Sequence, residues 1–124
     1  MSAGHLRGLR VLIAEDEALV AMDLTDTVEL AGGEVIGPFA TSRESADALG
    51  SASFDIAILD VRLEDGEVFP VADVIRDRNI PIVFHSGHIN PAELSKRYPN
   101  AGFCAKPSTP ERLVSILVAV QETK

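Results

Sequence analysis

Several charged or polar side chains stand at the ends of short apolar stretches, and together they could bind a metal ion and a phosphoryl group. These side chains are Glu15, Asp16, Asp60, Ser86 and Lys106. Three carboxylates held close together repel one another unless a cation lies among them. Oxygen ligands without an accompanying His or Cys favour Mg²⁺, which in proteins takes one or two carboxylates together with phosphate oxygens and waters. The residue types therefore indicate Mg²⁺-dependent phosphoryl chemistry, provided that the fold brings these side chains together.

The stretch that precedes Asp60 carries the clearest signal for the fold. Its apolar run Ile56–Leu59 is uninterrupted, which is typical of a strand buried on both faces in a parallel sheet. Pro38 cannot donate to a β-ladder and therefore puts the strand that contains it at an edge. In all, five strands are predicted, over residues 9–14, 34–38, 54–60, 81–84 and 102–105.

Helices are predicted after each strand. The second begins at a capping box made by Thr41 and Glu44, and the fourth at an N-cap, Asn90, followed by a proline. Strands that alternate with helices through right-handed crossovers form an α/β fold with a doubly wound, five-stranded parallel sheet. In such a sheet the carboxyl ends of the strands meet at one edge, where a binding crevice forms.

The first predicted helix, which ends at about residue 31, has two unlike faces. Its apolar residues on one side form a core-facing stripe: Val20, Ala21, Leu24, Val28 and Ala31. Leu19 and Met22 fall on the opposite side and are expected to be exposed. Residues 61–66, after the third strand, are predicted as a loop with a turn at Asp65-Gly66.

Length, charge and cysteine content exclude several classes of protein. The 124 residues fit one domain over 9–124, with residues 1–8 as a flexible leader. A formal net charge of −8 argues against a nucleic-acid or anionic-membrane partner, which would need clustered Lys and Arg. The sequence has no apolar run long enough to span a membrane. Its lone Cys104 is expected to be a buried, inert thiol, which fits a reducing, cytoplasmic compartment.

The segments that carry these residues match, in order and spacing, the receiver domain of two-component response regulators. They are Val11–Glu17, Asp55–Val61, Asp65-Gly66, Ser86-Gly87 and Lys106-Pro107. The chain thus resembles a receiver over nearly its whole length, which implies a flavodoxin-like three-layer sandwich with strand order 2-1-3-4-5. Residues 68–72 and 81–88 are also similar to an alphaproteobacterial group of receivers, the "FATGY" type, which are often stand-alone and linked to HWE-type or related histidine kinases. His85 and His88 stand where that group has Ala and Tyr.

The resemblance implies a role for each residue of the acidic group. Asp60 would be the phosphoacceptor, whose carboxylate takes a phosphoryl group from a phosphohistidine on a sensor histidine kinase or a phosphotransfer protein. Asp16 and Asp60 would bind Mg²⁺ directly, Glu15 through a water, and Arg62 through its backbone carbonyl. Lys106 and Mg²⁺ would neutralise charge that develops on the transferred phosphoryl group.

Further residues around the site also have expected roles from the resemblance. Ser86 would bond a phosphoryl oxygen and draw its loop inward, and Pro107 would be a cis proline that aims the preceding lysine into the site. Phe103 occupies the place of the aromatic switch residue, without the hydroxyl that a tyrosine would bring. Arg62 and His88 would flank the path of the water that hydrolyses the aspartyl phosphate.

The function expected from the sequence is a stand-alone receiver that signals by protein–protein contact and catalyses only its own phosphorylation and dephosphorylation. The exposed Leu19 and Met22 would dock the kinase, although scattered surface apolar residues are the alternative interpretation. Rival functions are a small phosphohydrolase with Asp60 as nucleophile, a flavin mononucleotide binder on the same fold, and a receiver that acts only as a docking module. A haloacid-dehalogenase-like hydrolase would need an acid where Arg62 stands, and the flavin binder would need a hydroxyl-rich loop after the first strand.

Overall fold

A central parallel sheet organises the protein. The computed structural model describes residues 4–87 and 89–122, and its five-stranded sheet has the order β2-β1-β3-β6-β7. All the pairings within this sheet are parallel, as predicted. The strands are β1 (Arg10–Ala14), β2 (Glu34–Phe39), β3 (Ile56–Leu59), β6 (Ile82–Ser86) and β7 (Gly102–Ala105). When only the five strands of this sheet are numbered along the chain, their order is the expected 2-1-3-4-5.

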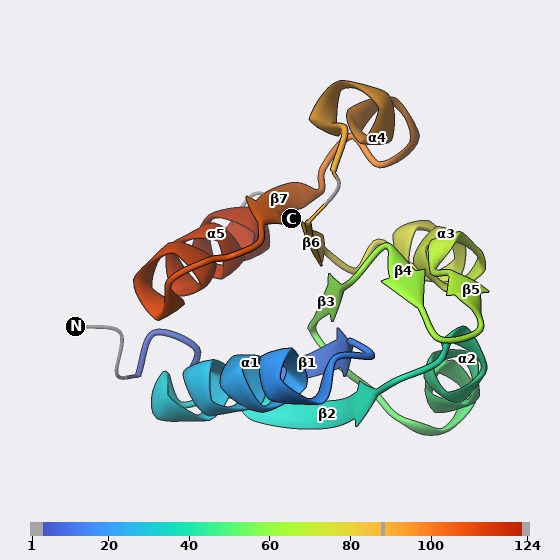
Figure 1. Ribbon diagram of the computed structural model, residues 1–124. Coiled ribbons are helices and arrows are strands. Elements are labelled where there is room, and N and C mark those ends of the chain that lie inside the picture. The colour runs from blue at the N-terminus through green and yellow to red at the C-terminus, as the bar shows by residue number, and fades with distance from the viewer. Residues whose placement is uncertain (1–3, 88, 123–124) are drawn as a thin grey trace.

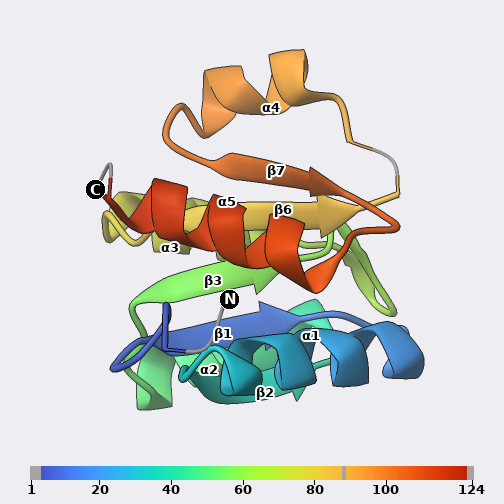
Figure 2. The same ribbon diagram turned by 90° about the vertical axis from the view of Figure 1, so that its left-hand side faces the viewer.

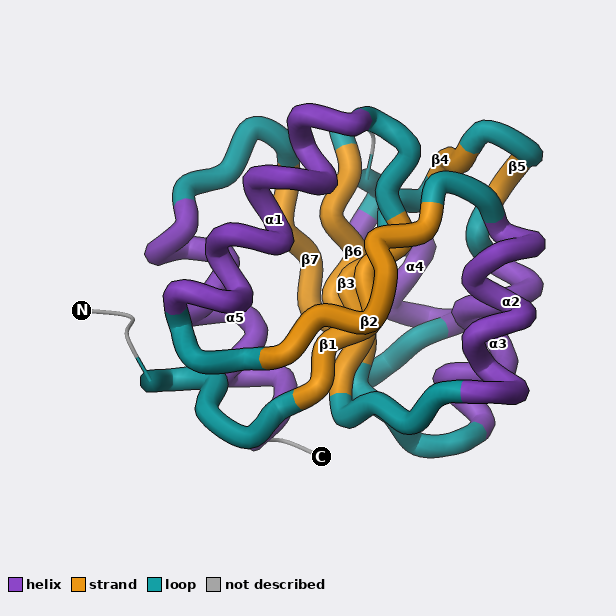
Figure 3. Tube along the Cα trace, turned by 90° about the horizontal axis from the view of Figure 1, so that it is seen from below, coloured by secondary structure: helices purple, strands orange, loops and turns teal. Residues whose placement is uncertain are grey.

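Helices cover both faces of the sheet and make the predicted three layers. They are α1 (Ala18–Leu30), α2 (Ser42–Ser51), α3 (Phe69–Asp77), α4 (Pro91–Arg97) and α5 (Pro110–Glu122). Helices α1 and α5 lie on one face, whereas α2 and α3 lie on the other (Figures 1 and 3), and α4 lies near the β7 edge (Figure 1). No helix in the described part of the chain is long and apolar enough to cross a membrane.

The core consists of two apolar clusters, one on each face of the sheet. Alternate residues of a strand point to opposite faces, so β1 sends Val11 and Ile13 to the α1/α5 side and Leu12 and Ala14 to the other side. All four are fully buried. This burial on both faces explains why the central strands are uninterrupted apolar runs in the sequence.

The predicted helix caps are present. The Thr41 hydroxyl accepts a hydrogen bond from the Glu44 backbone N–H at 3.0 Å, and the Asn90 side chain accepts one from Glu93 N–H at 3.2 Å. Each bond pairs an N–H that has no partner within its own helix. The two helices therefore start where the local sequence indicates.

The two faces predicted for the first helix are also confirmed. Ala21, Leu24 and Val28 of α1 are buried, whereas Leu19 and Met22 are 81% and 61% exposed. Cys104 is fully buried among the apolar residues on the α1/α5 side, as expected.

Two local features differ from the sequence predictions. The loop predicted over 61–66 contains a two-stranded antiparallel hairpin, β4 (Arg62–Leu63) and β5 (Gly66–Glu67), in which Leu63 pairs with Gly66 and its side chain is buried in the core. Strand β6 also continues to Ser86, two residues beyond its predicted end at Phe84.

The segment predicted as a flexible leader, residues 1–8, is anchored to the domain at Leu6. Leu6 is fully buried against the α1/α5 cluster, and its backbone N–H donates to the Ala31 carbonyl at 2.8 Å. A single buried leucine between polar neighbours gives too weak a periodic signal to be recognised in the sequence. Residues 1–3 lie outside the described residues.

Candidate functional site

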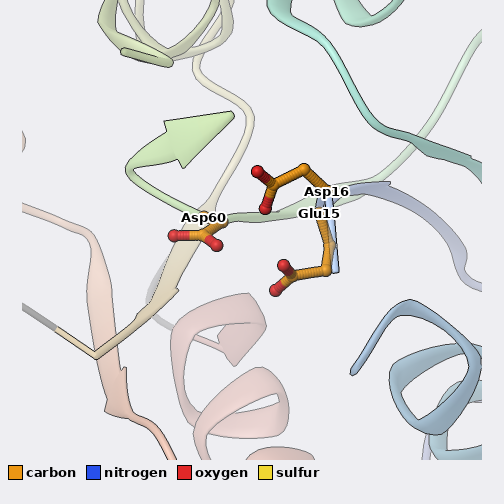
Figure 4. A group of neighbouring side chains, drawn as sticks. All are labelled: Glu15, Asp16 and Asp60. Carbon is orange, nitrogen blue, oxygen red and sulfur yellow. The ribbon is translucent and has the colours of Figure 1, made fainter. Parts of the chain in front are cut away.

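The acidic side chains meet at the carboxyl edge of the sheet. Strands β1 and β3 are paired neighbours with Ala14 opposite Leu59, so that Glu15 and Asp16 leave one strand beside Asp60, which leaves the other. The strands point the same way (Figure 2). Ligand oxygens of these three carboxylates all lie within 4.8 Å of one another, and Figure 4 shows them gathered in one place. The sequence prediction that they converge is therefore confirmed.

Lys106 brings a positive charge to the acids from the carboxyl end of β7, a strand at the side of the sheet. It follows β7, and its ammonium Nζ lies 2.9 Å from Glu15 Oε1, 2.9 Å from Asp60 Oδ2 and 3.1 Å from Glu17 Oε1. Only 15% of the Lys106 side chain is exposed, and the Glu15 side chain is fully buried. The ammonium thus compensates carboxylates that burial deprives of water.

Glu17 has a role that the sequence reasoning missed. The run Glu15-Asp16-Glu17 could have served only to cap α1, but Glu17 at the N-cap makes no side-chain capping bond. Its carboxylate instead binds Lys106, and its backbone N–H donates to Glu15 Oε2 at 3.0 Å. The sequence signal for this role was the presence of a third acid in the run. The contact itself could not be predicted, because Glu17 and Lys106 lie far apart in the chain.

Burial and charge shift the pKa values of the two central groups. Burial raises the pKa of the Glu15 carboxyl to about 7; the nearby Asp60 charge adds to this effect, and the bonds from Lys106 and the Glu17 N–H oppose it. Burial lowers the pKa of Lys106, but hydrogen bonds from its ammonium to Glu15, Asp60 and Glu17 outweigh burial and raise that pKa above its usual value. Lys106 therefore stays charged near neutral pH, whereas Glu15 changes charge there.

Ser86 is the last residue of β6, which lies beside β3, the strand that Asp60 follows. Register pairs Leu59 with Phe84 on these two strands, which puts Ser86 at the same edge as the carboxylates. The side chain is buried, and its backbone carbonyl accepts the Lys106 backbone N–H at 3.0 Å. The strand that carries the serine is thereby joined to the residue that carries the ammonium.

The remaining predicted site residues lie around this centre. Arg62 is exposed on β4, and its backbone N–H donates to Asp60 Oδ1 at 3.3 Å. Phe103 on β7 is partly buried and stacks on Phe84, with ring centroids 6.1 Å apart. The Lys106–Pro107 peptide bond is cis, as the resemblance implied. His88 lies outside the described residues.

One buried histidine near the site was not given a role from the sequence. His85 precedes Ser86 on β6 and is 3% exposed, and its Nε2 lies 2.9 Å from the Ser108 hydroxyl. Burial, together with the Lys106 charge, lowers the pKa of His85 below its ordinary value. A histidine that follows an apolar run in a strand was the sequence signal that His85 has a specific role. Its partner, Ser108, could not be identified without the fold.

A pocket in the protein lies away from the acidic side chains. A pocket of about 410 Å³ is lined by residues including Asn79, Ile82, Tyr98 and Val120. It shares no residue with the acidic cluster, and it lies near the start of β6, away from the carboxyl edge. Its size alone assigns it no part in the chemistry of the site.

The doubly wound sheet with an acid cluster and a lysine at its carboxyl edge defines a receiver-like α/β protein, and comparison with known families agrees. The family model of the response regulator receiver domain matches residues 11–118, so the chain belongs to this family. Receivers signal by phosphorylation and by contact with other proteins, and they interact with histidine kinases or phosphotransfer proteins. They are generally signalling proteins rather than enzymes, and they generally bind Mg²⁺ at an acidic pocket.

Solved structures and curated proteins show the same likeness. A receiver protein from Sinorhizobium medicae is 28% identical with a TM-score of 0.82, over 92% of this chain and 94% of that one. SdrG from Sphingomonas melonis is 32% identical with a TM-score of 0.77, over 94% and 97% of the two chains. The transcriptional regulatory protein PdtaR of Mycobacterium tuberculosis is 28% identical over 90% of this chain. The chain spans about half the length of the first curated relatives it matches.

Proposed function

We propose that Asp60 is the phosphoacceptor of this receiver. The observation that carries the proposal is the position of its carboxylate, which is buried, lies 2.9 Å from the Lys106 ammonium and belongs to the three-acid cluster. In the proposed step a carboxylate oxygen of Asp60 attacks the phosphorus of a phosphohistidine. The O–P bond forms as the N–P bond breaks, and the imidazole leaves with the bonding electrons.

The protein's own groups would assist this transfer by holding charge in place. The Lys106 ammonium, fixed by three carboxylates, is close enough to Asp60 to pair with negative charge that develops on the phosphoryl oxygens. The Arg62 backbone N–H, which donates to Asp60 Oδ1, orients the nucleophilic carboxylate. Ser86 is proposed to bond a phosphoryl oxygen after transfer and to act as the switch, with Phe103 responding beside it.

The donor set fits Mg²⁺, because every candidate side-chain ligand is a carboxylate oxygen. Asp16 and Asp60 would hold the ion directly, with Glu15 through a water and the Arg62 carbonyl as the backbone ligand. When bound, Mg²⁺ would neutralise charge on the phosphoryl group. Three carboxylates beside the Lys106 ammonium leave an excess of acidic groups, which a further cation would balance.

The proposed phosphodonor is a sensor histidine kinase of the HWE or a related type, in line with the "FATGY" resemblance, or a phosphotransfer protein. Docking would use the exposed Leu19 and Met22 of α1. The downstream step is proposed to be contact with another protein. A cytoplasmic location is part of the proposal, because the buried free thiol of Cys104 fits a reducing compartment. Arg62 and His88 are proposed to modulate hydrolysis of the aspartyl phosphate.

The test is intact-protein mass spectrometry after incubation with Mg²⁺ and a small phosphodonor such as acetyl phosphate. The wild type should gain one labile phosphate, and Asp60→Asn should gain none, because an amide is not a nucleophile of comparable strength. Asp55→Asn is the matched control, since Asp55 lies at the other end of the same strand and accepts the Arg10 N–H. If Asp60→Asn gains phosphate at the wild-type rate, the assignment is wrong.

A further inference from the structure

His85 connects two segments that the site requires. It stands on β6 next to Ser86, and its Nε2 lies 2.9 Å from the Oγ of Ser108, a distance typical of a hydrogen bond. Ser108 lies two residues after Lys106, in the segment between β7 and α5. The bond therefore runs from the strand of the proposed switch serine to the segment that presents the proposed catalytic ammonium.

The backbone ladder alone does not hold this segment. The pairing of β6 with β7 ends at Ser86 opposite Ala105, followed by the bond from Lys106 N–H to the Ser86 carbonyl. Pro107 has no N–H and cannot extend the ladder. The next anchor is the start of α5, where the Thr109 hydroxyl accepts the Arg112 N–H at 3.2 Å. Between these two points, the His85–Ser108 bond ties the segment to the sheet.

The charge state of His85 suits such a tie. Burial, and next the positive charge of Lys106, lower the pKa of His85, so the imidazole is neutral near pH 7. A neutral ring can exchange one hydrogen bond with a hydroxyl. The neutral ring adds no positive charge beside Lys106. A charged ring would repel the ammonium from the carboxylates that it binds.

We propose that His85 is a positioning residue for phosphoryl transfer, which holds Ser108 and so fixes the segment that aims the Lys106 ammonium at Asp60. The proposal rests on the proposed function of Asp60 as phosphoacceptor. Catalytic groups that shift by about 1 Å can lose much of their effect. Loss of the bond should therefore slow the transfer step itself. The three-acid cluster should bind Mg²⁺ as before, because the bond from His85 runs to Ser108 and not to one of the carboxylates.

The experiment compares His85→Ala, Ser108→Ala, the double variant and His85→Gln with the wild type. The maximal rate of phosphorylation by acetyl phosphate and the dissociation constant for Mg²⁺ are measured for each. We expect each alanine variant to lower the maximal rate by about two- to tenfold, the range of one neutral hydrogen bond. The double variant should be no slower than the slower single variant, since both remove the same bond. His85→Gln should recover most of the rate, and the Mg²⁺ constant should stay unchanged throughout.

A control separates positioning from general loss of stability. Ser45 is fully buried on α2, and its hydroxyl donates to the Thr41 carbonyl far from Lys106 in the chain, so Ser45→Ala should lower the melting temperature without slowing phosphorylation. If His85→Ala does not fold, Ser108→Ala tests the same bond from the less buried side. Unchanged rates, additive losses in the double variant, or no recovery with His85→Gln would each overturn the proposal. A wild type that gains no phosphate, or an Asp60→Asn variant that gains it normally, would instead contradict the proposed function.

Discussion

The pKa of the Glu15 carboxyl, about 7, makes Mg²⁺ binding depend on pH near neutrality. A metal ion competes with the proton for this carboxylate, so Mg²⁺ binding should release a proton and strengthen as the pH rises. With a pKa of about 7, about one tenth of Glu15 is ionised at about pH 6 and about nine tenths at about pH 8. The affinity for Mg²⁺ should therefore rise about tenfold across this interval.

The perturbation that isolates this effect is Glu15→Gln, which retains the shape of the side chain but cannot ionise. Isothermal titration of Mg²⁺ into both proteins between about pH 6 and about pH 8 measures the affinity, and repeating it in buffers of different ionisation enthalpy counts the released protons. The variant should bind Mg²⁺ more weakly at high pH and lack the part of the pH dependence that belongs to Glu15. Glu17→Gln is the matched control, because Glu17 also contacts Lys106 but is mostly exposed and lies outside the three-acid cluster.

The same shift predicts the stability of the metal-free protein, and its sign is opposite to that of an ordinary salt-bridged carboxylate. The pKa of Glu15 is raised from 4.5 to about 7, so the folded state binds the proton more tightly than the unfolded state does. The free energy of unfolding should therefore fall as the pH rises from about 4.5 to about 7, by up to about 3 kcal/mol, and then level off. Denaturant unfolding in the presence of a chelator should show this decline in the wild type and not in Glu15→Gln. Equal pH slopes in the two proteins, for both affinity and stability, would refute the reasoning.

Three further predictions concern docking, lifetime and switching. Glu replacements at Leu19 and Met22, which are 81% and 61% exposed, should slow phosphorylation by the cognate kinase and spare labelling by acetyl phosphate; equal loss in both assays would show damage to the fold or the chemistry instead. Arg62→Ala should speed the decay of the phosphoprotein, measured by loss of the phosphate mass, if the exposed side chain occludes the attacking water; slower or unchanged decay would contradict this role. Ser86→Ala should still accept phosphate but lose most of the change in amide NMR shifts along β6 and β7, because one hydrogen bond to a charged phosphoryl oxygen biases the two states by about ten- to a hundredfold. A full-sized response in that variant would exclude Ser86 as the switch.

The sequence by itself determined the layout of the sheet and the members of the acidic cluster. Apolar runs such as Ile56–Leu59 indicate buried parallel strands, and parallel strands bring their carboxyl ends to one edge whatever the details of packing. The sequence alone therefore predicts that Asp60 and Glu15 lie close together. Local chemistry also fixed the helix starts, because a capping residue such as Thr41 acts within its own turn.

Only the tertiary structure decided which partners these groups take and what charge they carry. The bonds from Lys106 to Glu17 and from His85 to Ser108 join residues 89 and 23 positions apart, and no local pattern encodes such a contact. Leu6 packs into the apolar cluster on the α1/α5 side, and its backbone N–H donates to the carbonyl of Ala31, the residue after α1. The pKa of Glu15 likewise depends on how completely the folded chain excludes water from one carboxylate, because desolvation acts through all the atoms that surround a group, and those come from several elements of the fold.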